Sequence, residues 1–187
     1  MKQNKGLQLA YLAGVIDSDG CITISKHAPR AQCQQKSPNY RVGIHINQVD
    51  GRMLDYIKGI FGGKIYVCKQ YGHGNATVYR WEIVSQDKAQ ALLKLLAPFL
   101  RYKKKQAEYA YQFCCLKNRQ EKDRLRRMKE SSGTDIIGRS KPVRKLTNNQ
   151  LKEREDLFLK IKKEKHTFVP SAAVETKRSE SSKDGKR

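Results

Sequence analysis

Asp19 is the residue of this sequence whose setting best suits metal-dependent chemistry. It follows shortly after an apolar segment, residues 5–17, in which small side chains recur at Ala10, Ala13 and Gly14. Small side chains let two such helices approach backbone to backbone, and this pairing would bring two Asp19 carboxylates together. Two unpaired carboxylates repel each other and call for divalent cations. A metal pair beside a phosphodiester can activate water and stabilise the leaving oxygen.

The segment that ends at Asp19 occurs once in the chain. Its pairing partner must therefore come from a second copy, which predicts a homodimer with an isologous two-fold interface. The alternative for Asp19 is an aspartate that only caps the end of a helix. Asp17 is expected to be structural and to stabilise the helix end or the interface.

The net charge of +21 indicates a polyanionic partner. Residues 1–117 carry 18 basic and 7 acidic residues (+11), and residues 118–187 carry 21 and 11 (+10). Because the excess is spread over both parts, it is not confined to a basic tail. Nucleic acid is the commonest partner of such a field; the alternative is a merely soluble basic or ribosomal protein.

Hydrophobic periodicity predicts an α+β fold in the order α-β-β-α-β-β-α-α. Two hairpins would form a four-stranded antiparallel sheet with helices packed on one face. Gly20 is expected to end the first helix with a positive φ, and Asp50, Ser85 and Thr147 to cap later helices. The predicted elements are helix 5–17, strands 22–27 and 41–47, helix 51–61, strands 64–70 and 78–83, helix 86–97, a helix from about 103 to 117 and, after Thr147, a helix to about residue 165.

The second face of this sheet is expected to be polar and to read base edges in the major groove. A solvated face without a partner is the alternative for any single residue. In the third predicted strand, Ile65 and Val67 are expected to point to the core and not to this polar face. Strand alternation predicts the base-reading or phosphate-contacting residues Thr23, Ser25, His27, Arg41, His45, Asn47, Tyr66, Cys68, Gln70, Arg80 and Glu82, with Arg30 reaching out from a loop.

Residues 12–20, Leu-Ala-Gly-Val-Ile-Asp-Ser-Asp-Gly, closely resemble the motif that names the LAGLIDADG homing endonucleases. They differ from it at Val15 and Ser18. The predicted element order is that of the family, and residues 98–107 look like the basic segment that single-motif members carry after the sheet. Gln48 also stands where a family glutamine is expected. The resemblance covers about residues 5–117.

The resemblance implies roles for four side chains. Asp19 would hold the metal and act in catalysis, and Gln48 would position the nucleophilic water. Lys103 would stabilise developing negative charge or tune that water, and Arg52 would belong to the same group. A simple phosphate contact is the alternative for Lys103, and the sequence leaves open which lysine of the run 103–105 points inward.

The resemblance further implies a homodimeric, site-specific double-strand DNA endonuclease that uses Mg²⁺, with Mn²⁺ as a substitute. Such proteins are usually encoded within introns. Each active site would cut one strand across the minor groove, leaving short 3′ overhangs in a long pseudo-palindromic target. Two alternatives stay open: a maturase that binds its intron RNA without cutting, and a non-cleaving transcriptional regulator. The Asp19 carboxylate argues against a purely non-catalytic protein, and residues 118–187 show no convincing helix-turn-helix.

Composition divides the chain into an endonuclease core at 1–117, a basic helical extension at 118–170 and a tail at 171–187 that is expected to be disordered. The longest apolar stretch, 89–100, falls short of the roughly 20 residues of a membrane span, and no signal peptide is evident. The five cysteines show no C-x-x-C spacing, which argues against a zinc site and favours a reducing compartment. An organelle, such as a chloroplast or mitochondrion, and a prokaryotic cytoplasm both fit.

Overall fold

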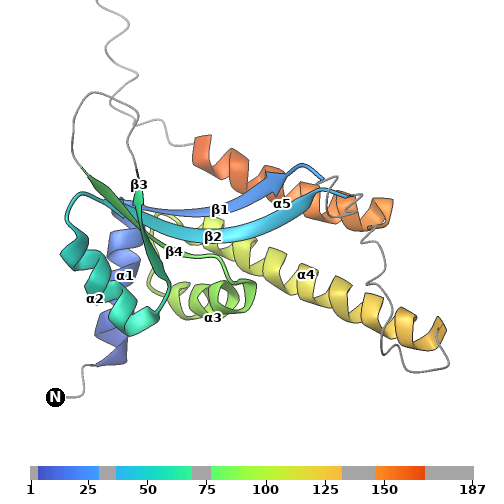
Figure 1. The fold of residues 1–187 in the computed structure, drawn as a ribbon, viewed down its shortest axis with the longest axis horizontal. Coiled ribbons are helices and arrows are strands. Elements are labelled where there is room, and N and C mark those ends of the chain that lie inside the picture. The colour runs from blue at the N-terminus through green and yellow to red at the C-terminus, as the bar shows by residue number, and fades with distance from the viewer. Residues whose placement is uncertain (1–3, 30–36, 69–76, 132–145, 167–187) are drawn as a thin grey trace, which may run out of the picture.

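The computed structural model of the chain describes residues 4–29, 37–68, 77–131 and 146–166. The predicted α+β order is confirmed, and so is the predicted helix after Thr147 (Figure 1). The elements are α1 (Lys5–Ser18), β1 (Gly20–His27), β2 (Asn39–Gln48), α2 (Gly51–Phe61), β3 (Lys64–Cys68), β4 (Val78–Ile83), α3 (Gln86–Leu96), α4 (Lys104–Ser131) and α5 (Asn148–His166).

The four strands form one antiparallel sheet in the order β1-β2-β4-β3. Apolar side chains alternate along each strand, so that paired residues such as Ile22 with Ile44 and Ile46 with Trp81 share the face that helices α1 to α4 cover (Figure 1). These four side chains are fully buried. The sheet therefore buries one face and leaves the alternate residues open, as the sequence predicts.

The junction from α1 to β1 depends on the absence of a side chain at Gly20. The prediction of a positive φ is wrong, because Gly20 already belongs to β1 and the described glycines with positive φ are Gly62 and Gly63. A Cβ atom on Gly20 would lie 2.6 Å from the Cα atom of Ile16. Close backbone approach thus selects glycine here and lets the strand begin directly after Asp19.

Gly20→Ala is expected to destabilise the protein by about 1–3 kcal/mol, the usual range for an overpacked site. The added methyl group meets backbone at Ile16, which cannot move aside as a flexible side chain would. Denaturant unfolding measures the loss. Gly59→Ala is the matched control, because a Cβ atom there meets nothing within 4 Å and the change should stabilise α2. Equal stability of both variants would contradict this account of the junction.

Helix α4 continues well past residue 117, where the sequence analysis ended it. The residues beyond 117 are strong helix formers, so the rise in charge there does not end the helix. This part of α4 pairs with α5: Arg119 contacts Glu153 at 3.1 Å, and the buried Arg154 donates from Nε to Gln120 Oε1 at 2.8 Å. The predicted boundary at residue 117 therefore lies inside one helix.

Helix α5 returns along the edge strand β1, beside α4 (Figure 1). Ile161 is buried in the common core, and the Phe158 ring packs at 6.1 Å from the ring of Tyr40. Glu155 accepts a hydrogen bond from Lys26 Nζ at 2.7 Å and another from the Tyr40 hydroxyl. A helix that lies along an edge strand in this way also shields it from pairing with another sheet.

The Lys26 hydrogen bond, with help from Tyr40, lowers the pKa of Glu155 below its ordinary value of 4.5. A carboxyl whose pKa is lower in the folded protein stabilises it above the unfolded value, and this stability is lost as pH falls through the folded value. Glu155→Gln should therefore melt at a lower temperature at pH 7 and lose less stability than wild type between pH 5 and pH 3. Thermal melting across this range checks it. A variant as acid-sensitive as wild type would refute the role of this carboxyl.

Several smaller predictions have mixed outcomes. Asp50 caps α2 by accepting from Arg52 N at 2.9 Å, and Thr147 Oγ1 accepts from Gln150 N at 3.3 Å, as predicted. Ser85 occupies the N-cap of α3 but makes no side-chain capping bond. Val67, predicted to point inward, is 66% exposed because it lies near the end of the edge strand β3.

No helix among the described residues has the length and apolar character of a membrane span.

Candidate active site

The predicted pair of Asp19 and Gln48 meets at one end of the sheet. Asp19 is the C-cap of α1, and its backbone N–H donates to Val15 O at 2.9 Å. Gly20 pairs with Ile46, so the end of β2 lies beside the start of β1. Gln48 Nε2 consequently reaches Asp19 Oδ2 at 2.8 Å. Both side chains remain open to solvent, which a group that acts on a large substrate requires.

Lys103 lies against the end of α1. Its Nζ donates to the carbonyl oxygens of Ile16 at 2.6 Å, Asp17 at 2.8 Å and Ser18 at 3.3 Å. These carbonyls lie in the last turn of a helix, at the negative end of its dipole, so a cation stabilises them. In the run 103–105, Lys103 is thus the lysine turned toward Asp19, while the other two begin α4 as exposed residues.

Asp17 holds the segment that carries Lys103. One carboxylate oxygen accepts from the backbone N–H of Arg101 at 2.7 Å and the other from that of Lys103 at 2.9 Å. This bridge fixes the approach of α4 to the end of α1. The structure therefore agrees with the prediction that Asp17 is structural.

Burial is the main cause that lowers the pKa of Lys103 below its usual value. The carboxylates of Asp17 and Asp19 act in the opposite direction, and the nearby charge of Lys165 adds to the lowering. The hydrogen-bond acceptors of the Lys103 ammonium are neutral carbonyls, so they do not offset its positive charge. Lys103 can therefore stabilise negative charge that develops beside Asp19.

Arg52 is not brought into contact with Asp19 or Gln48. Its guanidinium pairs with Asp50, with distances of 2.5 Å from Nη2 and 2.9 Å from Nε to Oδ2. The hydrogen bonds from Arg52 lower the pKa of Asp50 to about 2. The Arg52 side chain is 92% exposed. Its predicted role in the site would require it to leave this pair.

The open face of the sheet presents the predicted polar residues in rows across the strands. Ser25 pairs with Arg41, His45 with Glu82, and Asn47 with Arg80, whose Nε donates to Asn47 Oδ1 at 2.9 Å. Arg30 and Gln70 lie outside the described residues. The residues that stand on this face by strand pairing are Thr23, Ser25, His27, Arg41, His45, Asn47, Tyr66, Cys68, Arg80 and Glu82.

The predicted dimer surface is only partly on the outside of α1. Ala10 and Gly14 are exposed, but Ala13 is 1% exposed and packs in the core, so its inclusion in the interface is wrong. The reason is helical phase, because Ala13 shares the inward face with Leu12 and Ile16. Two large apolar residues that the sequence analysis missed, Leu7 and Tyr11, lie with Ala10 and Gly14 on the outward face. We call these four residues the exposed stripe of α1.

Cys21 and Lys165 are two neighbours of the site that the sequence analysis missed. Cys21 pairs with His45 across the sheet and accepts a hydrogen bond from Lys165 Nζ at 3.1 Å. The His45 hydrogen bond and the Lys165 ammonium, against the effect of burial, lower the pKa of Cys21 to about 7. Strand alternation could have found Cys21, since it precedes Thr23 on the same face. No local sequence signal pointed to Lys165.

The Asp19 carboxylate fits one kind of metal site. Among the described residues, no three His, Cys, Asp or Glu side chains gather closely enough to hold an ion by themselves. Mg²⁺ is commonly bound by one or two carboxylates, with waters and substrate phosphates as the other ligands. An exposed carboxylate that one amide holds in place suits such a shared site.

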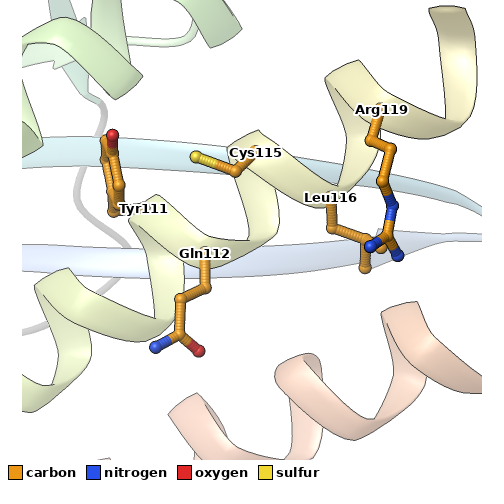
Figure 2. Close-up of a pocket in the computed structure, with 5 residues that line it drawn as sticks. All are labelled: Tyr111, Gln112, Cys115, Leu116 and Arg119. Atoms are coloured by element: carbon orange, nitrogen blue, oxygen red, sulfur yellow. The ribbon is translucent and has the colours of Figure 1, made fainter.

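A hollow elsewhere on the surface has a different character. Tyr111, Gln112, Cys115, Leu116 and Arg119, all from α4, line it (Figure 2). It contains no carboxylate and none of the predicted site residues. The hollow therefore lacks the side chains on which the prediction of metal-dependent chemistry rests.

Comparison with known proteins decides the family. A family model described as LAGLIDADG endonuclease matches residues 12–115, more than half of the chain. The chain belongs to this family. It is therefore a LAGLIDADG endonuclease, as the motif predicted. No curated protein matches the chain significantly.

Solved structures of homing endonucleases share the fold of this LAGLIDADG endonuclease. I-CvuI, in complex with its target in the presence of Ca, is 24% identical, with a TM-score of 0.52 over 87% of this chain and 98% of that one. The archaeal intron-encoded I-Vdi141I, complexed with DNA, is 18% identical, with a TM-score of 0.59 over 89% of each chain. I-SmaMI, bound to uncleaved DNA with calcium ions, is 17% identical, with a TM-score of 0.57 over 83% of this chain and 45% of that one.

Proposed function

We propose that this endonuclease is a homodimer that cuts both strands of a long, pseudo-palindromic DNA site in a Mg²⁺-dependent reaction, and that it is encoded within an intron. The observation that carries the proposal is the Asp19–Gln48 pair at the end of the open, polar sheet face. The Asp19 carboxylate lies at the end of a sheet face that would bind DNA. It is therefore suited to hold an ion against a phosphodiester. The metal, when bound, would supply an activated water and stabilise the leaving oxygen.

The residues of the chain would prepare this reaction. Gln48 holds one oxygen of Asp19 and keeps its carboxylate oriented. Lys103, fixed on the carbonyls of α1, would place a positive charge beside the phosphate that is cut. The side chains of the open sheet face would bind the groove and fix which phosphate reaches Asp19.

The exposed stripe of α1 supports the proposed homodimer. Leu7 and Tyr11 are 70% and 43% exposed, an apolar surface that a second copy of the same helix would cover. Such pairing is isologous and would bring the two Asp19 residues, each near the end of its α1, toward the symmetry axis. Each protomer would then act on one strand. The bound DNA of I-CvuI, I-Vdi141I and I-SmaMI, and the calcium present with two of them, support this substrate and a divalent ion.

A selection for cleavage tests the proposal. The full-length protein is incubated with a library of randomised DNA duplexes and Mg²⁺, and the cut ends are ligated and sequenced. We expect one long, nearly symmetric sequence to be recovered, with both strands cut. Binding of duplexes without any cleavage would instead support a regulator, and binding of structured RNA alone would support a maturase.

A further inference from the structure

Lys165 is carried to the active site by the packing of α5. Ile161 is fully buried, and Lys165 follows it by one helical turn. Tyr40 and Lys26, through Phe158 and Glu155, hold the middle of the helix. The last turn of α5 therefore has a defined place beside the start of β1, although 144 positions separate Lys165 from its partner there.

The partner is Cys21, and it puts the Lys165 ammonium on the open side of the sheet. The Lys165 Nζ lies 3.1 Å from the sulfur of Cys21, which follows Asp19 by two residues and pairs with His45. Lys165 is also close enough to Lys103 for its charge to lower the pKa of that lysine. Lys165, Lys103 and Asp19 thus share one end of the sheet.

Lys103 and Lys165, which lie at this end, and Arg52, which was only predicted for the site, differ in what they already bind. Lys103 donates hydrogen bonds to three carbonyl oxygens, and Arg52 forms an ion pair with the carboxylate of Asp50. Lys165 has no carboxylate within ion-pair distance among the described residues, and the thiol that it contacts is a weak acceptor. An ammonium has three donors, so Lys165 keeps donors for an anion.

We propose that Lys165 binds a DNA backbone phosphate next to the one that is cut, so that α5 forms part of the active site. The proposal rests on the DNA-cleaving function above. The function that it assigns to α5 is to place a cation beside Asp19. This cation offsets the repulsion between the Asp19 carboxylate and the DNA backbone. A phosphate interaction of this kind carries no sequence information and sets the register of the strand over Asp19.

Binding measurements on lysine variants of α5 test the first part. Lys165→Ala should weaken binding of the selected duplex in Ca²⁺ by about tenfold, the scale of a hydrogen bond to a charged group. It should also lower the salt slope by about one for each phosphate that is no longer neutralised. Lys163→Ala is the matched control: Lys163 is an exposed lysine of the same helix, two positions away and on another side. It should change the affinity by less than about twofold, because it has no place at this end of the sheet. Equal effects of the two changes would overturn the proposal.

Neutral phosphates locate the Lys165 interaction on the DNA. A series of duplexes, each with one methylphosphonate near the cleavage position, is bound by wild type and by Lys165→Ala. Wild type should be weakened at a phosphate adjacent to the cut one, and at that position Lys165→Ala should show no further loss, since the two changes remove the same interaction. Coupling only at a distant phosphate, or at none, would contradict the proposal.

The two proposals fail differently. If wild type neither binds nor cuts any duplex, the proposed function is wrong. If wild type cuts its site and Lys165→Ala binds as wild type does, only the inference about Lys165 is wrong. Thermal melting of both lysine variants should match wild type, and a lower melting point for Lys165→Ala alone would show that Lys165 serves the fold instead.

Discussion

Asp19→Asn is expected to leave DNA binding intact and to reduce cleavage by at least about 100-fold, the scale of removing one preorganised electrostatic group. The amide keeps the size of the side chain, and its oxygen can still accept from Gln48. It lacks the charge that would hold a divalent ion against the phosphate. Binding should even improve in the absence of metal, because a carboxylate near phosphate is repulsive.

Two aspartate variants control for this result. Asp55→Asn removes the same charge from an exposed position on α2 and should cut as wild type does. Asp17→Asn should lower the melting temperature, since Asp17 accepts hydrogen bonds from the backbone of Arg101 and Lys103. Gel-shift affinity in Ca²⁺ and plasmid cleavage in Mg²⁺ give the two readouts. Cleavage by Asp19→Asn at a rate near wild type would remove Asp19 from the active site.

Gly14→Leu is expected to abolish dimerisation and, with it, cleavage. Gly14 lies in the exposed stripe of α1, and a Cβ atom there meets nothing within 4 Å in the protomer. The protomer can therefore accept leucine, and its α1 should even gain from the better helix propensity. In a close helix pair, by contrast, each added side chain costs about 1–3 kcal/mol, and the two-fold axis doubles the effect.

The matched control is Gly59→Leu on α2, where the added Cβ atom also meets nothing within 4 Å. Sedimentation velocity of the three proteins separates monomer from dimer. We expect wild type and Gly59→Leu to be dimers and Gly14→Leu to be a folded monomer. A Gly14→Leu dimer that cuts its site would place the interface somewhere other than the stripe.

The residues that a local pattern controls could be predicted from the sequence. Asp19 and Gln48 meet because one ends a helix and the other ends the second strand of the hairpin that follows. The motif indicates Asp19, and the resemblance to the family indicates Gln48. The rows of the open sheet face follow from the period of two along each strand. The exposed stripe could be predicted only in part. Small residues indicate close packing but do not show which of them faces inward, and Ala13 in fact packs in the core.

The remaining features depend on tertiary packing that local patterns do not encode. Glycine at position 20 is selected by the backbone of Ile16, and the sequence alone cannot separate this cause from a positive φ. The rise in charge after residue 117 predicts the end of a helix, but α4 continues because Arg154 and Gln120 make this part a packed surface. Lys165 reaches Cys21 only because Phe158 and Ile161 dock α5 along β1.

A mixed dimer tests the central claim most directly. Wild-type and Asp19→Asn chains are coexpressed with different tags, and dimers that carry both tags are purified and incubated with a plasmid that contains the selected site and Mg²⁺. If each Asp19 cuts one strand of a site shared by two copies, the product is a nicked circle, while the wild-type dimer yields linear DNA. Linear DNA from the mixed dimer at the wild-type rate would contradict the account.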